Sequence, residues 1–134
     1  THSAEIIKIP ALKEISFGEW EGLTYEDIKA KWPKDVEKFF KKPAEVKISG
    51  GESFKEVQSR AWEAFNKIVQ ECEDESDIFI VSHGGTVRTI LCAVLNLDLN
   101  EMWNISIDNA GISCILHLED RCWIKNINDT NFLK

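Results

Sequence analysis

The spacing of apolar and polar residues divides the chain into segments of helical and extended character. After Ser53 the apolar residues recur at helical spacing, and their stripe predicts a helix with one buried face: Phe54, Val57, Ala61, Phe65, Ile68 and Val69. Glu56 lies three residues after Ser53, and this capping-box spacing fixes the start of the helix. Thr24 and Asp27 predict a second helix start, and Pro33 ends that helix.

The segments that follow alternate between extended and helical patterns. Residues 78–81 (Ile-Phe-Ile-Val) are all β-branched or aromatic, which is typical of a short strand buried on both faces. From Thr86 onward the apolar residues return to helical spacing, so a helix is predicted directly after that strand. Two later apolar runs, 111–118 and 122–127, predict a hairpin that turns at 119–121.

Two further helical segments are predicted in the first third of the chain. Residues 34–42 form a basic helix with Phe39 and Phe40 on its apolar side, and residues 3–7 have the pattern of a helix tail. The alternation of helices and strands indicates an α/β fold. At 134 residues and 43% hydrophobic residues, the chain has the size and composition of a single domain, 1–134.

The junction between the predicted strand and the helix after it carries the most reactive residue types. His83 follows the strand and precedes Gly84 and Gly85, at the start of the helix. Chemistry in open α/β sheets lies at the carboxyl ends of strands, and helix N-termini attract anions. The pattern therefore indicates chemistry on an anionic group such as phosphate. A lone histidine at a strand end is about equally often a polar residue satisfied by neighbouring backbone.

Composition and charge narrow the range of partners. The net charge of −7 argues against nucleic acid, and no apolar run approaches the ~20 residues that span a membrane. The four cysteines are too dispersed for a zinc knuckle, and Cys92 and Cys114 lie among apolar residues. We therefore expect free thiols in a reducing, cytoplasmic environment, with no metal and no cofactor.

Four short motifs occur in order along the chain. They are Leu-Lys-Glu-Ile-Ser-Phe-Gly-Glu-Trp-Glu-Gly-Leu-Thr (12–24), Gly-Gly-Glu-Ser (50–53), Ser-His-Gly-Gly (82–85) and Asn-Asp-Thr (128–130). With these motifs the chain resembles the histidine phosphatase superfamily, the phosphoglycerate mutase-like proteins, over nearly its whole length. Within that family it is most similar to small bacterial phosphatases, including the alpha-ribazole phosphatases. The resemblance implies a three-layer α/β/α sandwich of the phosphoglycerate mutase type.

The resemblance also implies roles for individual residues. His83 matches the second histidine of the family's phosphate pocket, which holds the phosphoryl oxygens, and the Gly84 N–H would lie close by. Glu14 matches the acidic residue that protonates the leaving alcohol and then activates water. His83 and Glu14 are thus the expected catalytic pair, facing one pocket, although spacing alone would make Glu14 an ordinary surface carboxylate.

The loop that carries Glu14 holds other candidates. Glu19 and Glu21 flank Trp20 and compete with Glu14 for the role of the acid, but we interpret both as loop acids. Trp20 is expected at the rim of the substrate pocket, because the glycines near it imply a tight loop beside Glu14.

The family's Arg-His-Gly tripeptide, whose histidine becomes phosphorylated, does not occur in this sequence. We therefore expect the chain to be the C-terminal part of a longer phosphatase, without the N-terminal strand and turn of the fold. His2 lacks the flanking arginine and glycine, and nothing else supports Thr1 as an N-terminal nucleophile. The chain alone is expected to be inactive, and the uncovered edge of residues 78–81 is expected to favour self-association.

The function implied by the resemblance is hydrolysis of a small phosphorylated metabolite through a phosphohistidine. A non-catalytic fragment or binding module of the same fold is the alternative, and a phosphoglycerate mutase is a further one. The compact spacing between Gly22 and Gly51 favours hydrolysis over mutase chemistry. The substrate stays open among alpha-ribazole phosphate, phosphoglycerate and other small phosphomonoesters.

Overall fold

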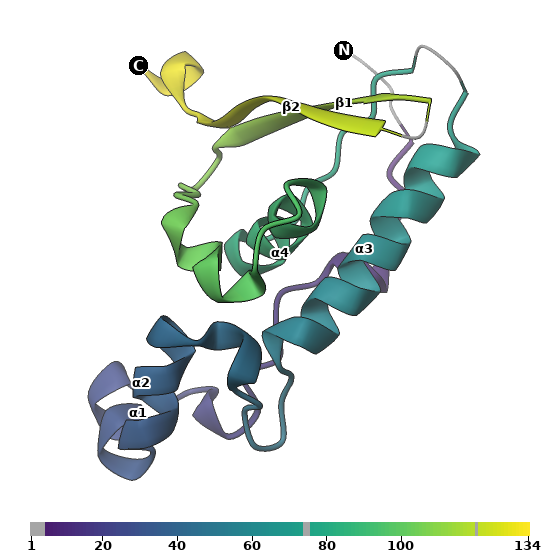
Figure 1. Cartoon of the computed structure of the whole chain (residues 1–134). Helices are drawn as coiled ribbons and strands as arrows, with labels where there is room; N and C mark the ends of the chain where they lie inside the picture. Colours follow the sequence, from purple (N-terminus) through teal and green to yellow (C-terminus); the bar gives the residue numbers. More distant parts are fainter. Residues whose placement is uncertain (1–4, 74–75, 120) are drawn as a thin grey trace.

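The structure, a computed structural model, describes residues 5–73, 76–119 and 121–134. Within these ranges the helices are α1 (Tyr25–Lys31), α2 (Pro33–Lys41), α3 (Phe54–Glu71) and α4 (Gly84–Val94), and the strands are β1 (Ile112–Leu118) and β2 (Arg121–Asp129). Short 3₁₀ turns connect them: η1 (Pro10–Leu12), η2 (Gly18–Trp20), η3 (Pro43–Glu45), η4 (Leu99–Asn104) and η5 (Asn131–Leu133). In Figure 1 the α1–α2 pair forms one end of the molecule and the β1–β2 hairpin the other, with α3 along the side.

Helix α3 begins where its sequence signal places it. The Ser53 hydroxyl accepts a hydrogen bond from the Glu56 N–H at 3.3 Å, and the Glu56 carboxylate accepts one from the Ser53 N–H at 2.7 Å. The predicted capping box is therefore confirmed. The apolar stripe is also confirmed, with its last two members partly buried. Ala61 and Phe65 from this stripe pack in one core cluster with Ile90 of α4.

The two short helices at the other end of the molecule enclose an aromatic cluster. Thr24 and Asp27 form the predicted capping box of α1, and Pro33 stands at the first position of α2. Phe39 of α2 is buried at the centre of the cluster, with its ring centroid 5.3 to 5.5 Å from the rings of Trp20, Phe40, Phe54 and Trp103. The cluster thus joins α2 to the loop before α1, to α3 and to η4.

The predicted C-terminal hairpin is confirmed. Strands β1 and β2 pair antiparallel from Leu118 opposite Arg121 to Ile112 opposite Asp129. The pair β1–β2 is the one sheet in the described ranges, and it packs on the core through its central residues Ile115 and Ile124. The α/β composition is therefore confirmed, while the three-layer sandwich stays a prediction for the whole protein.

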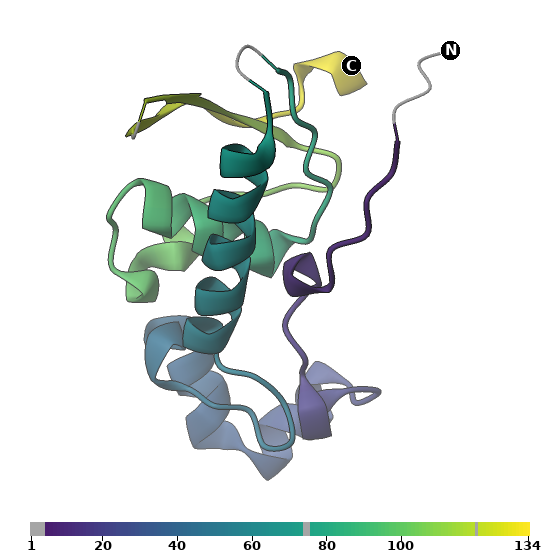
Figure 2. The same cartoon turned by 90° about the vertical axis from the view of Figure 1, so that its right-hand side faces the viewer.

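The prediction of a buried strand at 78–81 is wrong for the structure described. Phe79 and Val81 are 89% and 93% exposed, and no described segment pairs with these residues. The apolar pattern is that of a buried strand, but a strand forms only where a neighbouring strand supplies backbone donors and acceptors. Ile80 alone turns inward, against the cluster that holds Leu12. Figure 2 shows this segment descending beside α3, on the side where the N-terminal segment also runs.

The predicted helix tail at 3–7 is wrong in its described part. Residues 5–7 are not helical, and Ile6 and Ile7 are exposed; residues 3 and 4 lie outside the described ranges. All four cysteines are free thiols, as expected, but Cys72 is exposed while Cys92 is buried. Among the helices that the structure describes, none combines the length and the apolarity needed to cross a membrane.

Candidate active site

The N-terminus of α4 holds the carboxylate of Glu14. Glu14 Oε2 accepts a hydrogen bond from the Gly85 N–H at 2.9 Å, and Oε1 accepts from the Thr86 N–H at 3.0 Å and the Thr86 hydroxyl at 3.2 Å. The Ile15 N–H donates to Oε1 at 3.0 Å. Free N–H groups and the helix dipole both stabilise an anion at this position. The carboxylate is therefore fixed by its own loop and by α4 together.

The two glycines after His83 have different surroundings. A Cβ at position 85 would lie 2.6 Å from Glu14 Oε1, so the carboxylate reaches the backbone only because Gly85 has no side chain. A Cβ at position 84 would lie 3.1 Å from Nη1 of the flexible Arg88 side chain. The sequence pattern predicted a phosphate for this helix end, whereas the anion bound by the N–H groups of Gly85 and Thr86 is the protein's own carboxylate.

His83 stands directly before this helix. It is the N-cap residue of α4, with extended backbone angles, and its carbonyl accepts the first helical hydrogen bond, from the Val87 N–H at 2.8 Å. Its side chain is exposed, so it is free to meet a ligand. Because Glu14 binds the N–H groups two and three residues further on, both predicted catalytic residues lie at one helix terminus. Their roles in catalysis remain predictions.

The competing acids of the loop have other positions. The Glu21 carboxylate accepts hydrogen bonds from the Phe17 N–H at 3.0 Å and the Ser16 hydroxyl at 3.3 Å, so it stabilises the turn of its own loop. Glu19 is exposed. Of these three acids, Glu14 is the one whose carboxylate the structure shows bonded to α4.

A partly buried ion pair ties the Glu14 loop to α3. Arg60 Nε and Nη2 donate to the two carboxylate oxygens of Glu52 at 2.8 and 2.9 Å. The same guanidinium donates at 2.7 to 3.2 Å to three loop carbonyls, those of Ala11, Lys13 and Glu14. The hydrogen bond from Arg60 holds the pKa of the Glu52 carboxyl below its ordinary value of 4.5. A planar guanidinium can make all of these bonds at once, which an ammonium cannot.

A second arginine joins α4 to the aromatic cluster. Arg88 Nε donates to the Ile105 carbonyl at 2.8 Å, and its guanidinium carbon lies 5.3 Å from the centroid of the Trp103 ring. The Trp103 indole N–H donates to the Phe39 carbonyl at 2.8 Å. The N-terminal half of α4 and helix α2 are therefore in contact through Arg88 and Trp103.

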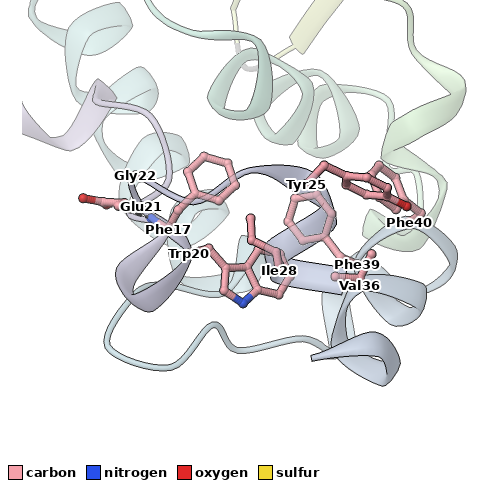
Figure 3. A pocket seen from close by; sticks show the side chains of 9 residues that line it. All are labelled: Phe17, Trp20, Glu21, Gly22, Tyr25, Ile28, Val36, Phe39 and Phe40. Atoms are coloured by element: carbon pink, nitrogen blue, oxygen red, sulfur yellow. Dashed lines mark hydrogen bonds between the residues drawn. The ribbon is translucent and has the colours of Figure 1, made fainter. Parts of the chain in front are cut away.

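A cavity of about 410 Å³ lies between η2 and the α1–α2 pair. Figure 3 shows aromatic rings converging on it from both sides, with the Glu21 carboxylate at its edge. Trp20 lines this cavity but is only 7% exposed, packed against Trp32 and Phe39. Trp20 thus stands in a buried wall of this cavity, and its place at the rim of a substrate pocket stays a prediction.

Residues 1–130 match the profile of the Histidine phosphatase superfamily, branch 1. The chain belongs to this family. It is 33% identical over 117 residues to phosphoserine phosphatase 1 of Hydrogenobacter thermophilus. This match covers 87% of the chain and 54% of that protein. It is 30% identical over 122 residues to the metal-independent phosphoserine phosphatase of Arabidopsis thaliana. This match covers 90% of the chain and 48% of that protein. The chain thus spans about half the length of the curated relatives it matches, and the family membership inferred from the motifs is confirmed.

Solved structures place this chain in the phosphoglycerate mutase-like fold. Bacillus stearothermophilus YhfR superposes with a TM-score of 0.87 at 26% identity, over 92% of the chain and 61% of that protein. The alpha-ribazole phosphatase from Shigella flexneri superposes with a TM-score of 0.76 at 23% identity, over 90% of the chain and 59% of that protein, a likeness of fold alone.

The roles of Arg60 and Arg88 were not predicted from the sequence. A signal did exist for Arg60, because it stands between Val57 and Ala61, at the edge of the apolar stripe of α3. A long charged side chain at the edge of an apolar face is stable only where hydrogen-bond acceptors surround its charged group. Arg88 and the aromatic cavity have no comparable local signal. In the ranges described, no three His, Cys, Asp or Glu side chains are grouped to hold a metal ion.

Proposed function

We propose that this chain forms about half of a phosphomonoesterase that works through a phosphohistidine, with His83 and Glu14 as its own catalytic residues. The observation that carries the proposal is the position of the Glu14 carboxylate, which is hydrogen-bonded to the N-terminus of α4, next to His83. A positioned carboxyl group and an exposed imidazole at one helix terminus place an acid–base group and a phosphate ligand within one site.

His83 is proposed to hold the transferring phosphoryl group. Its exposed side chain stands at the positive end of α4, where the helix dipole attracts negative charge. In the proposed arrangement its ring N–H donates to a phosphoryl oxygen, and the Gly84 N–H donates to a second one. Donors fixed in this way stabilise the charge that develops in the transition state.

Glu14 is proposed to serve as general acid and then as general base. In the first step the nucleophilic histidine bonds to phosphorus, the bond to the ester oxygen breaks, and Glu14 protonates the leaving alcohol. In the second step Glu14 takes a proton from water, which attacks the phosphohistidine and releases inorganic phosphate. General acid–base catalysis of this kind contributes about 10²–10⁴-fold in rate.

The nucleophilic histidine is proposed to lie in a segment that precedes Thr1 in a longer protein. The sequence contains no Arg-His-Gly, and the chain covers about half of the length of its relatives. A non-catalytic module of the same fold remains the competing candidate. The exposed imidazole of His83 beside the Glu14 carboxyl group favours the enzyme, because hydrolysis needs both groups in one site, whereas support of α4 needs only the carboxylate.

Hydrolysis is proposed in preference to mutase action. The matched relatives include both phosphoserine phosphatases and 2,3-bisphosphoglycerate-dependent phosphoglycerate mutases, so likeness alone supports either. The compact segment between Gly22 and Gly51 supports hydrolysis, since a mutase needs longer loops to retain a bisphosphorylated intermediate. A small phosphomonoester is accordingly the proposed substrate.

The proposal is tested by phosphatase turnover of two forms of the protein. We expect none from the 134-residue chain alone, and turnover from the longer protein that includes the preceding segment. In that longer protein His83→Ala should lower kcat by about 10²–10³-fold. The matched control is His117→Ala, because His117 is exposed on strand β1, opposite Cys122 at the turn end of the hairpin. Turnover by the 134-residue chain alone, or an active His83→Ala variant, would contradict the proposal.

A further inference from the structure

The cavity beside η2 is lined almost wholly by apolar groups. Its walls come from two aromatic-rich segments and carry the rings and branched side chains of Phe17, Trp20, Tyr25, Ile28, Phe39 and Phe40. Figure 3 shows the rings of Tyr25 and Phe40 together at one end and the Glu21 carboxylate at the other. Tyr25 and Phe40 are each about half exposed, so the cavity opens to solvent between them. A volume of about 410 Å³ falls in the range of small-molecule sites.

Two structural links join the cavity to the proposed phosphate site. The first is the chain itself: Phe17, in the cavity wall, follows Glu14 by three residues on one loop. The second passes through Arg88, whose Nη1 lies beside Gly84 and whose guanidinium lies over Trp103, while the Trp103 ring centroid is 6.0 Å from that of Phe40. The cavity wall and the start of α4 are thus joined by one loop and by one series of side-chain contacts.

The charge of the lining decides which organic group fits. Glu21 is the one charged residue among those lining the cavity, and its carboxylate would repel a second negative charge on the substrate. A carboxylate-bearing alcohol such as serine would also leave its charge without a partner among apolar rings. An aromatic or branched alkyl group would instead gain by leaving water.

We propose that this cavity takes the organic part of the substrate, and that this part is uncharged and apolar, of about the size of an aromatic ring. The inference rests on the proposed phosphomonoesterase activity and adds the substrate class: phosphate esters of apolar, ring-bearing alcohols. Phe40 determines the specificity through contact with the ring, and Phe17 and Tyr25 complete the wall.

The test compares two substrates with matched leaving groups, 2-phenylethyl phosphate and ethyl phosphate. Both release a primary alcohol, so their ratio of kcat/KM reports the binding of the phenyl ring. We expect a ratio of about 10–100 for the longer protein, because burying a ring of this size contributes that much. In Phe40→Ala the ratio should fall toward unity, and an unchanged circular dichroism spectrum should show that the variant is folded. O-phosphoserine should be a poorer substrate than 2-phenylethyl phosphate.

The control variant is Phe132→Ala, because Phe132 is as exposed as Phe40 but lies in the C-terminal turn η5. It should leave the ratio unchanged. Measurable turnover with a ratio near unity, or an equal loss on both substrates in Phe40→Ala, would overturn the inference and leave the proposed activity intact. Should no phosphate ester be hydrolysed at all, NMR titration of the chain with 2-phenylethanol decides: shifts confined to Phe17, Tyr25 and Phe40 sustain the cavity's role, and their absence refutes it.

Discussion

At the scale of single residues, Glu14 owes its place to four donors and to one missing side chain. The donors come from Ile15, Gly85 and Thr86, and the space comes from Gly85, where a Cβ would lie 2.6 Å from the carboxylate. The family resemblance predicted that Glu14 matters, and the Gly-Gly pair predicted an anion at this helix. Neither predicted that Glu14 is itself the anion, because residues 14 and 85 meet only through the tertiary fold.

Replacing Gly84 and Gly85 separately tests whether the missing side chain at position 85 holds the Glu14 carboxylate in place. Gly85→Ala should lower the free energy of unfolding by about 1–3 kcal/mol, because the new methyl group displaces the carboxylate from its donors. Gly84→Ala should change it by less than about 1 kcal/mol, because only the flexible end of Arg88 must move. Chemical denaturation measures both. If the cost of Gly85→Ala is as large in a Glu14→Ala background as in the wild type, the carboxylate is not the cause.

At the scale of elements, the loop carrying Glu14 has no regular structure beyond η1 and η2. Hydrogen bonds from the Arg60 side chain take the place of the backbone hydrogen bonds that a helix or a sheet would give its carbonyls. One guanidinium from α3 satisfies three loop carbonyls and pairs with Glu52. The capping boxes that start α1 and α3 were predictable because their partners lie three residues apart. The contacts from Arg60 to the loop carbonyls were not, because they join residues 46 to 49 positions apart in the sequence.

The Glu52–Arg60 pair predicts an acid-sensitive step in stability. The pKa of Glu52 in the folded protein lies below its ordinary value of 4.5, so the pair stabilises the fold fully above that value, and the contribution is lost as the pH falls. Thermal midpoints by circular dichroism from about pH 6 to about pH 3 should therefore fall less steeply in Glu52→Gln than in the wild type. Glu45→Gln, which removes an exposed ion pair with Lys42, should leave the slope unchanged. Equal slopes in the wild type and Glu52→Gln would exclude the pair as the cause.

At the scale of the whole molecule, the structure predicted from the local sequence pattern differs most from the observed structure at residues 78–81. The pattern is that of a buried strand, yet Phe79 and Val81 are almost fully exposed and no described strand lies beside them. The hairpin was predictable because β1 and β2 are adjacent in the sequence and supply each other's partners. A strand inside a sheet depends on partners from elsewhere, which a local pattern does not contain.

An exposed apolar segment with free backbone groups predicts self-association of the 134-residue chain. Sedimentation velocity over a range of concentrations should show a dimer or larger species. Val81→Lys should shift the chain toward monomer, because a charge on this edge opposes pairing. Leu133→Lys, at an exposed apolar position of η5, should not. A wild-type chain that stays monomeric at every concentration contradicts this expectation.

The most direct test of the central claim, that Glu14 is the proton donor at a phosphomonoesterase site with His83, is the leaving-group dependence of Glu14→Gln in the longer protein. Ethanol needs a proton to leave, whereas p-nitrophenolate does not. We expect Glu14→Gln to lower kcat/KM for ethyl phosphate by about 10²–10⁴-fold and to change that for p-nitrophenyl phosphate much less. His83→Ala should slow both substrates alike, since it removes a ligand of the phosphoryl group. An equal loss on both substrates in Glu14→Gln would show that Glu14 only supports the fold at α4.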